Sequence, residues 1–144
     1  MKHIYNGVAK LIKDNIPGIV WIDQDTGQLE YYVLRPGLDF PAALIDVSYS
    51  DCVNNGSGQE QRCAVEISVR VVFEIWNESN MAAPESVRAL ALSMYDTLDD
   101  IRKNLHAVKM ETGEVLYREA VRPEKREDGL KVFNMSFRCK TTEK

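Results

Sequence analysis

Hydrophobic side chains occupy every second position between residues 63 and 75, and mostly polar residues lie between them. A strict period of two predicts a β-strand with one buried face. At about 3.3 Å per residue such a strand would extend roughly 40 Å, about twice the usual length. We therefore expect it to bend, or to run past its own domain and pair with another chain. Its candidate inter-subunit positions are Val69, Val71, Phe73 and Ile75.

Two stretches have the hydrophobic spacing of amphipathic helices, residues 2–16 and residues 81–105. Proline disfavours helical backbone in the residue before it, so Pro17 ends the first helix. Pro84 is compatible with the second helix because it lies in the first turn. The hydrophobic faces consist of Ile4, Val8, Leu11 and Ile12 in the first, and of Val87, Leu90, Ala91, Met94, Leu98, Ile101 and Leu105 in the second.

Shorter runs of β-favouring residues predict the remaining strands. The stretch 50–60 is rich in glycine and asparagine, so we expect a mobile loop there, and a loose tail over 141–144. In the last strand we expect alternate residues to face inward, namely Phe133, Met135, Phe137 and Cys139. The five additional strands are expected over 19–23, 28–34, 42–49, 114–122 and 130–140.

The resulting element order is α-β-β-β-β-α-β-β, which is typical of an α+β fold. We expect one domain over residues 1–144, with an antiparallel sheet and both helices packed on one of its faces. A chain of 144 residues has a common single-domain size.

Composition excludes several functional classes. The net charge is −4, with 44% hydrophobic and 28% charged residues, so a general nucleic-acid coat or a polybasic membrane binder is not expected. No signal-peptide core or membrane span is visible, which favours the cytoplasm. The cysteines, Cys52, Cys63 and Cys139, form no metal-ligand spacing. We interpret Cys63 and Cys139 as small core residues.

The search for catalytic motifs finds neither a phosphate-binding loop nor a nucleophile elbow. His3 lies near the N-terminus and His106 at a helix end, where the helix dipole favours it. Asp46 and Glu66 could converge from neighbouring strands as a Mg²⁺ site of a nuclease. The lysine common two residues after such a glutamate is replaced by Ser68. The alternative is that Glu66, Arg70 and Glu74 form a solvated strand face with cross-strand ion pairs.

Two further surfaces are candidates for binding. The charged segment around residues 118–128 is either a soluble hairpin tip or an arm that contacts a neighbouring subunit or faces DNA. Its candidate interface or lumen residues are Arg118, Arg122, Lys125 and Arg126. A small-molecule-binding domain is a third functional class, for which Trp21, Tyr31 and Trp76 would line an enclosed pocket.

The order of elements and scattered positions resemble the tail completion, tail terminator and head–tail joining proteins of long-tailed phages and prophages. The resemblance rests on the N-terminal helix, the proline-containing loop 35–41 and the long strand ending Phe73-Glu74-Ile75-Trp76. It continues in the helix containing Val87 to Leu98, and in the final hairpin, which carries Arg118, Arg122 and Asp128-Gly129.

This resemblance implies a non-enzymatic virion protein without cofactors. Such proteins form rings, commonly hexameric, that cap the tail tube and dock it to the head connector. The implied partners are further copies of the chain, tail tube and head connector proteins, and DNA that passes through the lumen without specific binding. The chain would be located in the bacterial cytoplasm during assembly and then in the virion.

Overall fold

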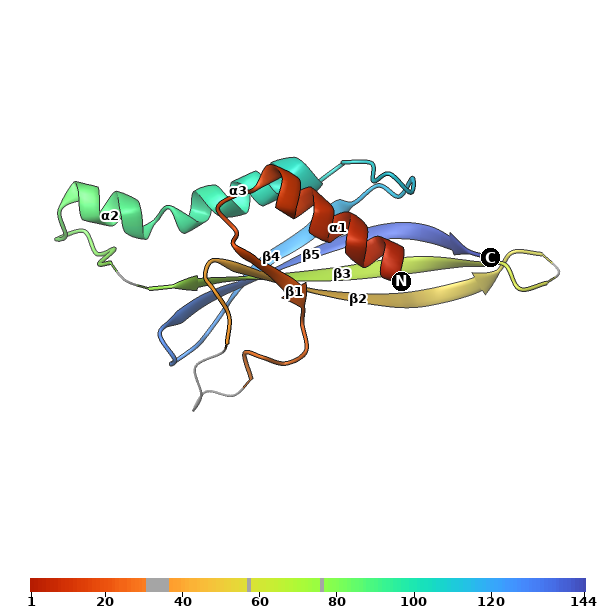
Figure 1. The fold of residues 1–144 in the computed structure, drawn as a ribbon, viewed down its shortest axis with the longest axis horizontal. Coiled ribbons are helices and arrows are strands. Elements are labelled where there is room, and N and C mark those ends of the chain that lie inside the picture. The colour runs from red at the N-terminus through yellow and green to blue at the C-terminus, as the bar shows by residue number, and fades with distance from the viewer. Residues whose placement is uncertain (31–36, 57, 76) are drawn as a thin grey trace.

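The computed structural model describes residues 1–30, 37–56, 58–75 and 77–144 of the chain. Five strands form one sheet in the order β1-β2-β3-β5-β4, and helices lie along one of its faces (Figure 1). The elements in chain order are α1 (Lys2–Asn15), β1 (Trp21–Gln24), β2 (Ala42–Asn54), β3 (Gln61–Glu74), α2 (Glu85–Ala91), α3 (Met94–Leu105), β4 (Tyr117–Glu124) and β5 (Leu130–Glu143). The fold is α+β, as expected from the sequence.

The sheet is mixed, because β1 is parallel to β2 while the other neighbouring strands are antiparallel. β1 takes β2 as its partner, and the strand predicted over 28–34 is not seen at its start. Gln28–Glu30 form a turn, and the rest of that prediction, residues 31–34, lies outside the described residues.

The predicted long strand is present as β3 and lies at the centre of the sheet. It pairs with β5 from Gln61–Glu143 to Glu74–Leu130 and with β2 from Ala42–Val72 to Asn54–Gln61. A bulge between Ser50 and Val53 shifts the β2 register by one residue. Bulges bend and twist a strand locally, and β2 and β3 curve together in Figure 1.

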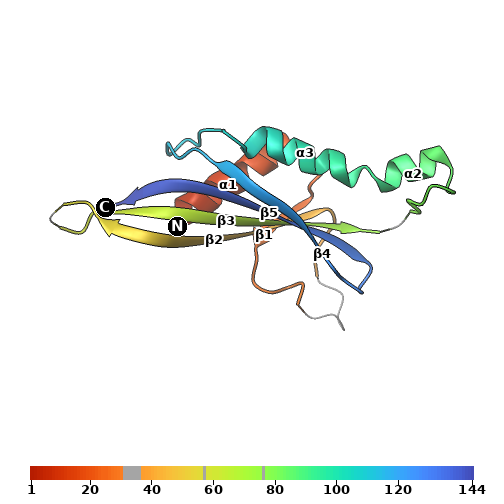
Figure 2. The same ribbon diagram turned by 180° about the vertical axis from the view of Figure 1, so that it is seen from behind.

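Side chains at odd positions of the central strands form the main core beneath the helices. α1 contributes Ile4, Val8 and Ile12, and α3 contributes Leu98, Ile101 and Leu105. Figure 2 shows both helices on the same side of the sheet from behind. The prediction that the helices share one face is therefore confirmed for α1 and α3. The inward residues predicted for the last strand, and the two core cysteines, are buried as expected: Phe133, Met135, Phe137, Cys139 and Cys63.

The opposite face of the sheet carries a smaller core at even positions. The strand residues in it are Ala42, Leu44, Val72, Leu130 and Val132, and Leu29 joins them from the segment after β1. Partly buried Trp21, Leu38 and Phe40 pack against it. Of the segment between β1 and β2, the described residues Leu29, Leu38 and Phe40 cover this face near β1, below the sheet in Figure 1.

The helix predicted over 81–105 is divided into α2 and α3, which is a correction to the sequence interpretation. The Ser93 hydroxyl donates a hydrogen bond to the Leu90 carbonyl at 2.7 Å, and the Ser93 N–H binds the same carbonyl rather than continuing the α-helical pattern. Local hydrogen bonds of this kind compete with the helix. α2 contains no buried residue, so Val87, Leu90 and Ala91 do not form the buried face that was predicted.

The two segments that we expected to be a mobile loop and a loose tail, residues 50–60 and 141–144, lie largely within strands. β2 continues to Asn54 and β3 begins at Gln61, so the expected loop 50–60 is shortened to the tip of a long hairpin. β5 extends to Glu143, where Tyr49 donates a hydrogen bond to the Glu143 carboxylate at 2.7 Å. The tail 141–144 is therefore paired with β3 over most of its length.

Candidate interaction surfaces

The central place of β3 overturns the inter-subunit strand predicted from the sequence. Val69, Val71 and Phe73 are buried in the main core. The backbone of Val69 and Val71 is paired with β2 and β5, and Phe73 is paired with β5. Ile75, directly after β3, is exposed. A strand whose hydrogen bonds are satisfied on both edges has none to offer another chain. In the described part of the chain, β1 and β4 are the two edge strands of the sheet. The portion of β2 beyond Ile45 and the portion of β5 beyond Arg138 also lack a strand neighbour on one side.

The charged hairpin divides into exposed and buried residues. Arg118, Arg122 and Lys125 are exposed and remain candidates for contacts with other molecules. The Arg126 side chain is only 2% exposed and binds Asp128, Glu124 and the Leu29 carbonyl oxygen. Arg126 therefore stabilises the subunit from within and is not an interface residue.

Arg70 is the centre of an ion-pair cluster that the sequence interpretation missed. Its guanidinium binds Glu124 through two bonds, Nε to Oε1 at 2.8 Å and Nη2 to Oε2 at 2.7 Å. Nη1 lies 3.1 Å from Asp25 Oδ2 and 2.9 Å from Glu30 Oε1. Burial alone would lower the pKa of Arg70, but these carboxylates raise it overall and keep the side chain charged. The cluster fixes the segment after β1 to the β4–β5 hairpin across the sheet.

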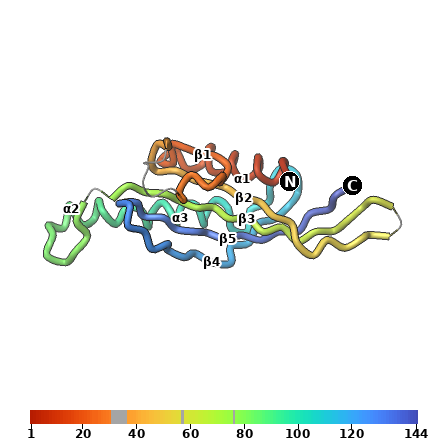
Figure 3. The backbone as a smooth tube through the Cα atoms, turned by 90° about the horizontal axis from the view of Figure 1, so that it is seen from below, coloured from red at the N-terminus to blue at the C-terminus, as the bar shows by residue number. Residues whose placement is uncertain are grey.

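The end of the molecule beyond β3 exposes a set of hydrophobic side chains. Residues 77–92, which we call the α2 arm, project past the sheet (Figures 1 and 3). Met81 is 83% exposed and Leu90 is 62% exposed, and Leu92 and neighbouring Tyr95 are exposed as well. Hydrophobic side chains gathered in one exposed region are typical of a binding surface.

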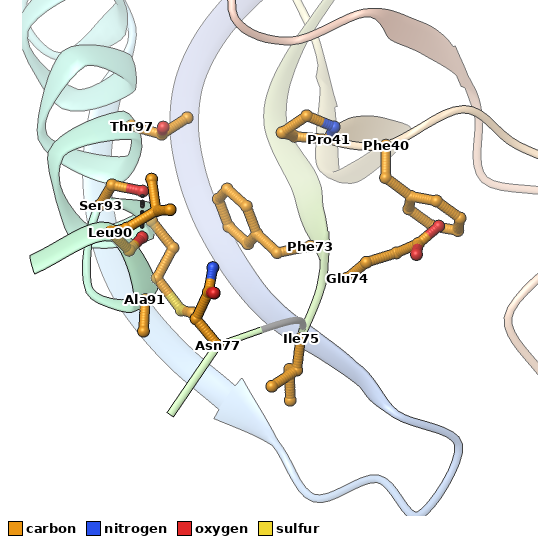
Figure 4. A pocket seen from close by; sticks show the side chains of 11 residues that line it. Phe40, Pro41, Phe73, Glu74, Ile75, Asn77, Leu90, Ala91, Ser93 and Thr97 are labelled. Atoms are coloured by element: carbon orange, nitrogen blue, oxygen red, sulfur yellow. Dashed lines mark hydrogen bonds between the residues drawn. The ribbon is translucent and has the colours of Figure 1, made fainter. Parts of the chain in front are cut away.

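A groove of about 390 Å³ runs between the base of the α2 arm and the end of β3. Figure 4 shows Leu90 on the helical side and Phe73 on β3 facing each other across it. Phe40 and Pro41 close its other side. The lining is mainly hydrophobic, which suits a protein side chain better than a charged ligand.

A second hollow, of about 560 Å³, lies at the opposite end of the molecule. It is formed by the ends of β2, β3 and β5, and its basic residues are Arg62, Arg138 and Lys140. Val53 at its edge is 63% exposed. Arg138 is already paired with Glu66 and Glu119, whereas Arg62 and Lys140 have no ion pair with any residue that the structure describes. We call this surface the basic hollow.

The geometry gives little support to the nuclease alternative. Asp46 pairs with Ser68 and Glu66 with Ser48, so both carboxylates are on one face of the sheet. Glu66 is bound by Arg138 at 3.0 Å, as expected for a solvated face with cross-strand ion pairs. Among the described residues, no group of three or more histidine, cysteine or acidic side chains could hold a metal ion.

The remaining candidates have structural roles or fall outside the described residues. His3 Nε2 lies 3.2 Å from Glu114 Oε1, and His106 Nδ1 accepts a hydrogen bond from the Arg118 N–H at 3.0 Å. Of the proposed aromatic pocket, Tyr31 and Trp76 lie outside the described residues, and Trp21 packs against the smaller core. No helix in the described ranges has the length and hydrophobicity needed to cross a membrane.

No protein-family model and no curated protein matches the sequence. A structural match exists to a chain of a particle described as the virion of a native gene transfer agent. The match has a TM-score of 0.56 and covers 97% of this chain and 95% of that chain, at 10% sequence identity. The two chains share a fold. The match extends over nearly the whole of both chains.

Proposed function

We propose that this chain is a structural protein of a phage-like virion, a subunit of a tail completion, tail terminator or head–tail joining ring. The observation that carries the proposal is the fold shared, almost end to end, with a chain of a gene transfer agent virion. The element order in the sequence supports the same class of protein independently.

The surface of the subunit supports a role in assembly. The α2 arm exposes hydrophobic side chains that its own sheet does not cover. β4 and the distal part of β2 have open edges among the described residues. Open edges and uncovered hydrophobic groups favour association with other chains. Contacts of this kind between unlike surfaces of identical subunits close into rings when the rotation permits.

In this role the protein acts by presenting surfaces and not by catalysis. Its proposed partners are further copies of itself, the tail tube and the head connector. Exposed Arg118, Arg122 and Lys125 lie near Glu119 and Glu127, so the local charge is nearly balanced. Such a surface would let DNA pass through a ring lumen without being held by its phosphates.

Light scattering after size-exclusion chromatography, combined with negative-stain electron microscopy, tests this function. We expect a closed ring whose mass is a whole multiple of the subunit mass, with the fraction of rings increasing with concentration. A strictly monomeric protein at every concentration would contradict the proposal.

A further inference from the structure

We infer that the α2 arm of one subunit binds the basic hollow of the next copy of the same chain. This inference rests on the proposed ring function and names the contact that would build it. Its two surfaces are residues 77–92 on one side, and Val53, Arg62 and Lys140 on the other.

The first step is that the described part of the subunit leaves most of the α2 arm uncovered, with Ala83 as its buried residue. No residue of α2 is buried, and the exposed hydrophobic side chains Met81, Leu90 and Leu92 follow the arm along its length. Exposing these side chains to water is unfavourable, at about 25 cal/mol for each Å² of hydrophobic surface. A surface that covers them therefore gains free energy.

The second step is the position of the two surfaces. Figure 1 shows α2 at one end of the long axis and the tip of the β2–β3 hairpin at the other. An arm cannot reach the hollow of its own subunit, because the whole length of the sheet separates them. Contact between them joins two copies head to tail, and a head-to-tail contact between unlike surfaces generates a ring when the rotation from one copy to the next closes.

The third step is charge. The α2 arm carries Glu78 and Glu85 without an ion pair to any described residue, against the single base Arg88. In the basic hollow, Arg62 and Lys140 are the bases left without an ion pair within the described ranges, and Asp51 is the acidic residue of the lining. Opposite net charges favour the approach of the two surfaces and disfavour arm-to-arm or hollow-to-hollow pairing. Val53 supplies a hydrophobic contact for the arm at the edge of the hollow.

Charge reversal on each surface tests this contact. One variant carries Glu78→Lys with Glu85→Lys, and the other carries Arg62→Glu with Lys140→Glu. In each variant the arm and the hollow carry net charges of the same sign and repel each other. We therefore expect the dissociation constant of the contact between subunits to rise about tenfold or more. The control Asp100→Lys changes an exposed acidic residue of α3, away from both surfaces, and should associate as the unmodified chain does.

Mixing the two variants gives the decisive measurement. The arm of each variant is then complementary to the hollow of the other, so an equimolar mixture should recover oligomers that contain both variants in alternation. Light scattering measures the recovery, and native mass spectrometry of variants with different tags measures the alternation. Circular dichroism confirms that both variants are folded.

The outcomes separate this inference from the proposed function. Rings that persist in both variants would overturn the arm-to-hollow contact and leave the ring intact. Variants that dissociate but do not recover on mixing would also overturn the contact. An unmodified chain that stays monomeric throughout would contradict both the contact and the ring.

Discussion

Arg70 holds three carboxylates together on the face of the sheet that the helices do not cover. Removing a buried arginine leaves its acidic partners close together and poorly solvated, and that costs more than the loss of a surface pair. Arg70 is 9% exposed and contributes both bonds of a two-point contact with Glu124. Arg62 is on the same strand and the same face of the sheet but is exposed. The two arginines therefore form a matched pair for measuring the effect of burial.

We expect Arg70→Met to lower the free energy of unfolding by about 3–5 kcal/mol, because it leaves Glu124, Asp25 and Glu30 without their shared cation. Arg62→Met should change it by less than about 0.5 kcal/mol, as is usual for surface positions. Urea denaturation of dilute protein, followed by circular dichroism, measures both. Equal losses in the two variants would contradict the structural role of the Arg70 cluster.

Acid should weaken the ion pairs around Arg126. Hydrogen bonds from the Arg126 guanidinium lower the pKa of Asp128 below its ordinary value of 3.8. The folded state therefore binds the Asp128 proton less readily than the unfolded state does. The stabilisation is fully present above the ordinary pKa and is lost as the pH falls through the lowered one.

We accordingly expect Asp128→Asn to be less stable than the unmodified chain at pH 7 and to lose less stability between about pH 5 and pH 2. The urea midpoint of unfolding, measured at several pH values across this range, shows how steeply the stability of each protein changes with pH. Asp39→Asn removes an exposed carboxylate near the same face and serves as the control. Parallel curves for Asp128→Asn and the unmodified chain would show that Arg126 does not act in this way.

At the residue scale, the sequence could predict which positions are buried but not which polar groups meet. The odd positions of β3 and β5 are buried as their alternation indicates. Arg70 was interpreted as part of a solvated face, since its partners come from Asp25, Glu30 and Glu124, far away in the chain. The Arg126 side chain, in a highly charged segment, is buried because it reaches the Leu29 carbonyl oxygen, which is also far away in the chain.

The two halves of the predicted long helix differ in what lies beneath them. α3 places Leu98, Ile101 and Leu105 against the sheet, whereas α2 extends past its edge. Hydrophobic periodicity is nearly the same in both halves, so the sequence predicted one continuous buried face. It could not show where the sheet ends, and so the exposed hydrophobic face of α2 was mistaken for core.

Matched truncations in the two helices should separate packing from exposure. Ile101→Ala removes a fully buried side chain, and we expect the free energy of unfolding to fall by about 2–5 kcal/mol. Leu90→Ala removes a side chain that is mostly exposed in the single subunit, so the change should stay below about 0.5 kcal/mol. Thermal unfolding at low protein concentration measures both. A large loss for Leu90→Ala would mean that α2 packs within its own subunit.

The sequence predicted which segments form strands better than it predicted which strands are neighbours in the sheet. Alternation along β3 gives its buried face but not its neighbours, because an edge strand and a central strand can show the same period of two. The hydrophobic residues at both parities near its end, Val71, Val72 and Phe73, were the available signal for burial on both faces. They belong to the two cores on opposite sides of the sheet.

At the scale of the whole molecule, stability and association are concentrated in different places. β3 has hydrogen-bonded neighbours on both sides and lies between the two cores. The α2 arm extends from one end with no buried residue in its helix, and the basic hollow lies at the other end. The rate of amide hydrogen exchange depends on local stability, which is lowest at frayed ends and highest in the core of a protein. The arm and the core should therefore exchange hydrogen very differently.

Hydrogen–deuterium exchange at two concentrations would measure this difference. In dilute protein we expect residues 61–74 to exchange slowest and residues 77–92 to exchange within the earliest time points. At concentrations where the chain associates, protection should increase at the arm and at residues 53–62 together, since one contact would cover both. α1 faces neither surface and serves as the internal control, with equal exchange at both concentrations. Protection that increases at the arm alone would indicate contact between arms, which like charges disfavour, and would contradict a head-to-tail ring.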